Sequence, residues 1–75
     1  MAIAKKTWKP TEGSCGRNAT YAIDAAGIMT VRVDLNVTLG PSASGKTNII
    51  ATSGGNQQIA GGDGAVIGLN VYKKV

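Results

Sequence analysis

One segment of this chain has the residue pattern of a phosphate-binding loop. Residues 40–47 read Gly-Pro-Ser-Ala-Ser-Gly-Lys-Thr and match the P-loop pattern Gly-x-x-x-x-Gly-Lys-Ser/Thr in full. In nucleotide hydrolases such a loop follows a strand and opens a helix. Its backbone N–H groups then wrap the phosphates, the lysine reaches the terminal phosphate, and the hydroxyl binds magnesium. The pattern raises nucleotide hydrolysis as a hypothesis that the flanking residues must support.

The flanking residues argue against hydrolysis. Residues 48–55 (Asn-Ile-Ile-Ala-Thr-Ser-Gly-Gly) are poor helix formers and good strand formers. The magnesium of such an enzyme also needs an acidic residue at the end of a second parallel strand, and neither Asp24 nor Asp63 has that setting. We therefore predict a loop between two strands. Anion binding without hydrolysis stays open as an alternative, through Ser44, Gly45, Lys46 and Thr47.

No other set of residues predicts catalysis. The 75 residues include no His, one Cys and four carboxylates scattered along the chain. General-base chemistry and a structural zinc site both lack their usual residues. We expect a non-enzymatic protein with no catalytic residues, no metal, no cofactor and no small-molecule substrate. Cys15 reads as a small residue in a loop rich in Gly and Ser.

Basic residues accompany aromatic residues near both ends of the sequence. Lysines neutralise phosphates and aromatic rings stack on bases, a combination typical of proteins that bind single-stranded nucleic acid. The net charge of +4 favours an anionic partner. The candidate nucleic-acid residues are Lys5, Lys6, Trp8, Lys9, Arg17, Arg32, Lys46, Tyr72, Lys73 and Lys74, with Tyr21 as an extension. The alternative is that the terminal lysines are solvated tails and that Trp8 fixes the N-terminal arm to the core.

Alternating hydrophobicity predicts the elements that carry these residues. From Ile28 to Leu39 every odd position is apolar and five of the six even positions are polar. This period of two predicts a long strand with one buried face, bent or bulged because of its length. Residues 20–24 alternate too, and Ala-Ala-Gly at 25–27 predicts a hairpin between the two strands.

The second half of the sequence predicts three more strands. Residues 47–53 are rich in β-branched side chains, and 56–60 follow a predicted two-residue turn at Gly54-Gly55. A turn at 61–64 then precedes a last strand over 65–71. The fold class is therefore all-β, with five to six mainly antiparallel strands in a small sandwich or barrel. Residues 1–18 form an N-terminal arm or edge strand, and 19–75 a single β domain.

The small size of the chain predicts self-association. A domain of this length has a thin core, and such domains are usually stabilised by disulfides, metals or oligomerisation. One cysteine and no histidine leave oligomerisation. We expect a homo-oligomer, and a structural or assembly role is the alternative to nucleic-acid binding. No secretory leader or membrane-spanning run is evident, which predicts a cytoplasmic or virion- and phage-associated protein without a membrane partner.

Residues 28–73 resemble a family of short, functionally uncharacterised prokaryotic and phage-associated β proteins. The resemblance rests on the segment Gly-Pro-Ser-Ala-Ser-Gly-Lys-Thr-Asn-Ile-Ile-Ala-Thr-Ser-Gly-Gly-Asn at 40–56 and on the ending Gly-Leu-Asn-Val-Tyr-Lys at 68–73. It implies that the Ser-Gly-Lys-Thr loop belongs to a compact β unit. It implies no activity and assigns no functional residue.

Overall fold

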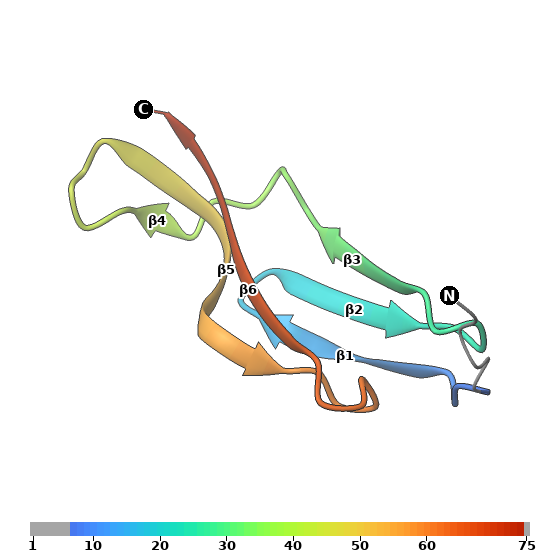
Figure 1. The fold of residues 1–75 in the computed structure, drawn as a ribbon. Coiled ribbons are helices and arrows are strands. Elements are labelled where there is room, and N and C mark those ends of the chain that lie inside the picture. Colours follow the sequence, from blue (N-terminus) through green and yellow to red (C-terminus); the bar gives the residue numbers. More distant parts are fainter. Residues whose placement is uncertain (1–6, 75) are drawn as a thin grey trace, which may run out of the picture.

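The computed structural model describes residues 7–74, which form six strands and no helix. Two three-stranded antiparallel sheets contain them (Figure 1). Sheet A has the order β1-β2-β3 and sheet B the order β4-β5-β6. The predicted all-β class with five to six antiparallel strands is confirmed. The bounds are β1 Thr11–Gly16, β2 Ala19–Ile23, β3 Met29–Val33, β4 Gly40–Pro41, β5 Thr47–Gln58 and β6 Val66–Lys74.

The hairpin between β2 and β3 forms where the sequence predicts it. The Asp24 carboxylate accepts hydrogen bonds from the backbone N–H groups of Ala26 (2.9 Å) and Ile28 (3.0 Å). Gly27 has a φ of 83°, and a side chain there would collide with the Trp8 indole. A glycine is required at this position both by the left-handed backbone and by the close approach of the ring.

The predicted strand over 28–39 is shorter in the structure, because β3 ends at Val33. The Asp34 carboxylate accepts hydrogen bonds from the backbone N–H (2.9 Å) and the side-chain amide (3.0 Å) of Asn36. Such a local bond offers the backbone a turn in place of the ladder. Leu35, expected on the buried face, is 64% exposed as a result.

The predicted turn at Gly54-Gly55 and the separate strand over 56–60 are wrong. Residues 47–58 form one strand, β5, which pairs with β6 along its length. Thr52 is paired with Asn70 and Asn56 with Gly68, so three residues of β5 face a single residue of β6. The positive φ of both glycines serves this bulge, and the chain does not reverse direction. The turn over 61–64 and the last strand are confirmed.

Three consecutive residues connect the two sheets at the turn between β1 and β2. A Cβ at Gly16 would overlap the backbone of Thr52 and Ser53, so only glycine permits this approach. Arg17 and Thr52 exchange backbone hydrogen bonds of 2.8 and 3.2 Å. The Asn18 amide donates to the carbonyls of Asp34 and Ile50, each at 2.9 Å. These bonds attach one end of sheet A, where β1 and β3 end, to β5.

The core lies between the inner faces of the two sheets. Its buried members are Cys15, Ala19, Tyr21, Ile23, Ala51 and Ile59, with Trp8, Val31, Val33, Ile67, Leu69 and Val71 half-buried around them. Cys15 therefore does not lie in a loop as predicted; it belongs to β1 and is 2% exposed. Tyr21 is also buried, and its hydroxyl donates to the Ala60 carbonyl at 3.1 Å. A ring in this position has no face open to a base.

The molecule is elongated, with extents of 47 × 22 × 19 Å and a radius of gyration of 14.9 Å. A compact domain of 75 residues has a radius of about 11 Å. The elongation arises where the β4–β5 hairpin and the end of β6 extend beyond sheet A (Figure 1). This extension carries the candidate site.

Candidate nucleic-acid interface

Pairing of β5 with β6 brings four of the predicted nucleic-acid residues together at one end of the molecule. Thr47 is paired with Lys74 and Asn48 with Lys73, and Lys46 directly precedes this pair in the chain. Tyr72 is opposite Ile49 and is 63% exposed. We call Lys46, Tyr72, Lys73 and Lys74 the basic tip. Tyr72 and Lys74 share one face of the sheet and Lys73 lies on the other, because side chains alternate along a strand.

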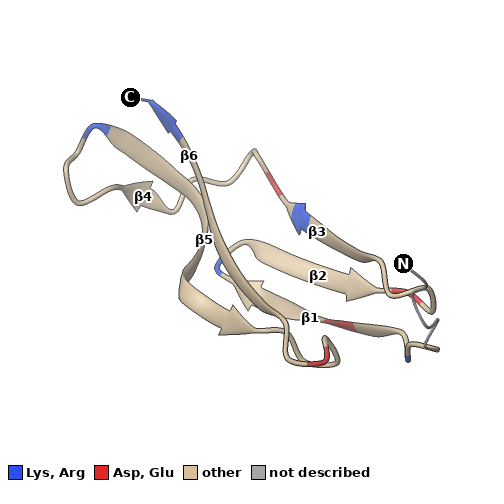
Figure 2. Cartoon of the chain, in the orientation of Figure 1, with Lys and Arg blue, Asp and Glu red and all other residues tan. Residues whose placement is uncertain are grey.

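The basic tip lies at the end of sheet B, whose strands contain no carboxylate, with Lys46 directly before β5. Acidic residues are absent from the sequences of β4, β5 and β6. The four carboxylates of the chain are Glu12 in β1, Asp24 and Asp34 in the connections of β2 and β3, and Asp63 in the β5–β6 turn. In Figure 2, blue Lys segments mark the start of β5 and the end of β6 with no red beside them, whereas Asp and Glu lie along sheet A and at the opposite end of the β5–β6 hairpin. Other Lys and Arg segments lie on or near sheet A, among the acidic ones. Within residues 7–74, no Asp or Glu side chain therefore belongs to the strands that carry the tip.

The other predicted basic residues do not join the tip. Lys9 precedes β1, Arg17 lies in the β1–β2 turn, and Arg32 lies on the outer face of sheet A. All three are exposed. Lys5 and Lys6 fall outside the described residues. The predicted set thus separates into one cluster of four residues and single cations elsewhere.

Trp8 occupies the position that the alternative interpretation gave it. Its indole is half-buried against the core and lies over Gly27, and its backbone N–H donates to Ala25 at 3.2 Å. The residue attaches the segment before β1 to the β2–β3 hairpin. Tyr72 is therefore the candidate aromatic residue with an open ring at a basic cluster.

The P-loop-like segment is a strand-to-strand connection with its own hydrogen bonds. Its first two residues form β4, and no helix follows, because Thr47 begins β5. The N–H of Ser42 donates to Thr47 (2.8 Å), that of Gly45 to Ser42 (2.9 Å) and that of Lys46 to the Ser44 hydroxyl (3.4 Å). A phosphate-binding nest needs these groups to point at the anion. Of the four predicted anion-binding residues, Lys46 has the group best suited to an anion, the ammonium group of its side chain.

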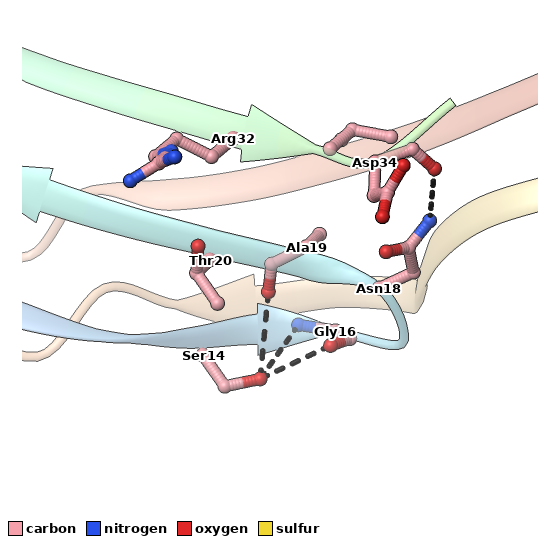
Figure 3. A pocket seen from close by; sticks show the side chains of 8 residues that line it. Ser14, Gly16, Asn18, Ala19, Thr20, Arg32 and Asp34 are labelled. Atoms are coloured by element: carbon pink, nitrogen blue, oxygen red, sulfur yellow. Dashed lines mark hydrogen bonds between the residues drawn. The ribbon is translucent and has the colours of Figure 1, made fainter. Parts of the chain in front are cut away.

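An open polar hollow of about 430 Å³ lies on sheet A, near the β1–β2 turn (Figure 3). Cross-strand pairing aligns Ser14, Thr20 and Arg32 along it, and Asn18 and Asp34 close one end. The Ser14 hydroxyl already donates within its own turn, to Gly16 at 3.0 Å. The hollow combines one cation with one carboxylate, so it lacks the single sign of charge that the tip has.

Residues 7–74 show neither a metal-ligand cluster nor a membrane-spanning helix. No three Cys, Asp or Glu residues in that range lie close enough together to hold an ion. None of its segments is a helix long and apolar enough to cross a bilayer.

Comparisons with protein-family models, with curated proteins and with solved structures give no match to this chain. The residues of the tip are therefore the basis on which a function can be proposed. Sequence patterns indicated its charged and aromatic residues but not the strand pairing that gathers them. They also missed Asn48 and Ile49, the cross-strand neighbours of Lys73 and Tyr72, because neither residue type signals binding.

Proposed function

We propose that this chain is a small non-enzymatic protein that binds single-stranded nucleic acid at the basic tip. The observation that supports the proposal is the register of β5 and β6, which brings Lys73, Lys74 and the exposed Tyr72 of β6 beside the start of β5, directly after Lys46. The strands of this sheet contain no Asp or Glu. Lysines there meet backbone phosphates, and the Tyr72 ring stacks on a base. Single strands are favoured over duplex because an unpaired base exposes its face to the ring.

The charge of the tip sets the expected salt dependence. Three phosphate contacts on a single strand give a slope of about −2 in log affinity against log salt, since each contact contributes about −0.7. Raising the salt from about 50 to 200 mM should then weaken binding by about 20-fold. Neutralising two of the three lysines reduces the expected slope to about −0.7 and the loss to about threefold.

Fluorescence anisotropy with a labelled oligothymidylate tests this proposal. The double variant Lys73→Gln/Lys74→Gln should bind more weakly and with the shallower salt slope. The matched control is Lys9→Gln/Arg32→Gln, which removes the same net charge from exposed residues outside the tip. Equal effects of the two double variants would show that only overall charge matters, and absence of binding by the native protein at low salt would refute the function.

The tyrosine has its own pair of variants. Tyr72→Phe keeps the ring and should retain affinity, whereas Tyr72→Leu should lose about 1–3 kcal/mol, or roughly 5- to 150-fold. A Tyr72→Leu variant that binds like Tyr72→Phe would exclude stacking from the mechanism.

A structural role in a homo-oligomer is the second candidate function. The observation that favours it is surface area: the chain exposes 5542 Å², whereas a compact monomer of 7.6 kDa exposes about 4,300 Å². Large apolar side chains contribute to this surface, among them Ile28, Leu35 and Val66 at 62%, 64% and 55% exposure. Light scattering after size exclusion tests this role, and a monomer at about 100 µM would rule it out.

A further inference from the structure

Among the strands that the structure describes, none pairs with the second edge of β6 along its nine residues. The strand β6 pairs with β5 on one side and stands last in the order of sheet B. Its sequence alternates between half-buried Ile67, Leu69 and Val71 and exposed residues between them. A long, regular edge without proline, charge in its middle or a bulge is a template for another strand.

Hydrogen bonds in sheet B show which backbone groups of β6 face this open edge. The Leu69 N–H donates to the Ser53 hydroxyl of β5 at 2.9 Å, so the Leu69 backbone points toward β5. Thr52, the partner of Asn70, directs its own N–H and C=O to Arg17, away from β6. Since backbone groups alternate sides along a strand, those of Asn70 point outward, as do those of Gly68 and Tyr72.

We propose that a second copy of this chain pairs with the β6 edge, antiparallel and about a two-fold axis at Asn70. This inference rests on the second candidate function, the homo-oligomer, and names the surface that forms it. The register uses the outward N–H and C=O of Asn70 for a reciprocal pair with the partner's Asn70. It is also the register that pairs all nine residues, because Val66 then lies opposite the partner's Lys74.

The side chains of β6 suit this register on both faces. On the inner face, Leu69 lies opposite the partner's Val71, which extends the half-buried apolar row from one copy to the next. On the outer face, Tyr72 lies opposite the partner's Gly68, which has no side chain to clash with the ring, so one face of the ring can contact the partner and the other stays open to a base. Antiparallel pairing also holds the Lys73–Lys74 ends apart, whereas parallel pairing would place them side by side.

The area available fits a dimer. The exposed surface exceeds that of a compact monomer by about 1,200 Å², and a standard interface covers about 800 Å² on each partner. One interface therefore removes most of the excess. The dimer carries a basic tip at each end of a continuous ribbon, with the two Lys74 residues about 26 Å apart along it, from eight residues at about 3.3 Å each.

Proline at the central position tests the pairing. Asn70→Pro removes an N–H that faces the open edge and leaves the bonds of β6 to β5 in place, so the fold should persist. We expect light scattering to give about 15 kDa for the native chain, twice the 7.6 kDa of the monomer, and the monomer mass for Asn70→Pro. Asn70→Ala is the matched control: it loses the same hydrogen bond from Thr52 (2.8 Å) but keeps the N–H, and should remain dimeric.

Disulfide trapping provides a second measurement that does not depend on tolerance of proline. Paired residues about a two-fold axis have Cα atoms about 5.5 Å apart, which is within disulfide range, so Asn70→Cys should cross-link under mild oxidation. Cys15 is buried and should stay unreacted. Thr30→Cys, exposed on the edge strand β3, is the control and should not cross-link. If the native chain is a monomer, both the homo-oligomer and this interface are overturned. If the native chain is a dimer but Thr30→Cys cross-links, or Asn70→Pro remains dimeric, the interface alone is overturned.

Discussion

Asn18→Asp should destabilise the fold strongly, although the two side chains have the same shape. The Asn18 amide donates to the carbonyls of Asp34 and Ile50, both at 2.9 Å, and so fixes the ends of β3 and β1 to β5. A carboxylate replaces this donor with an acceptor that faces two carbonyl oxygens. The backbone conformation, a φ of 55°, is tolerated by Asn and Asp alike. The substitution therefore tests the hydrogen bonds separately from the turn.

The magnitude follows from the two bonds. Each contributes about 1 kcal/mol, and the part-buried Ile50 carbonyl left beside a carboxylate adds a further penalty, so the expected cost is about 2–4 kcal/mol. A core of this size supplies about 3–5 kcal/mol in all. Melting temperature should fall by at least about 8 °C, since 1 kcal/mol corresponds to roughly 4–8 °C in a domain of this length.

Urea unfolding followed by the fluorescence of Trp8, the single tryptophan, measures this cost. Asn18→Gly is the control, because glycine accepts the positive φ and removes the donor without adding a charge. It should cost about 1–3 kcal/mol, less than Asn18→Asp. An Asn18→Asp variant as stable as the native protein would show that these two bonds do not hold the sheets together.

Two further predictions concern the Trp8 contact and the P-loop-like segment. Gly27→Ala should destabilise the fold by about 1–3 kcal/mol and shift Trp8 emission to longer wavelength, because the new Cβ collides with the indole. Gly45→Ala is the control, because Gly45 also has a positive φ but faces open space. It should lower the stability measured by urea unfolding less and leave the emission unchanged. The native protein should bind inorganic phosphate and ATP only weakly, since the loop N–H groups bond within the loop. Calorimetry should therefore give the same weak binding for Lys46→Ala. Tight binding by the native protein that Lys46→Ala abolishes would instead establish an anion site.

Sequence patterns predicted the fold where hydrophobic period and turn chemistry act locally. The alternation in β2 and β6 and the Ala-Ala-Gly hairpin each depend on neighbouring residues, and each was confirmed. Errors arose where a local signal had two meanings. Gly54-Gly55 suits a hairpin turn and a bulge equally, and the long-range pairing with β6 decides between them. The alternation past Val33 continued, but the Asp34–Asn36 turn interrupted the strand.

The candidate site depends on a register shift that composition does not reveal. Ile50 and Ala51 are adjacent, yet both are buried, at 1% and 0% exposure. Consecutive residues of a regular strand point to opposite faces. A bulge between Ile49 and Ala51 lies at this point. It shifts all earlier residues of β5 by one position against β6. Asn48 thereby meets Lys73 and not Lys74. A change of one residue in this bulge would move Lys46 relative to Tyr72 and the C-terminal lysines, so the bulge sets the geometry of the charged end.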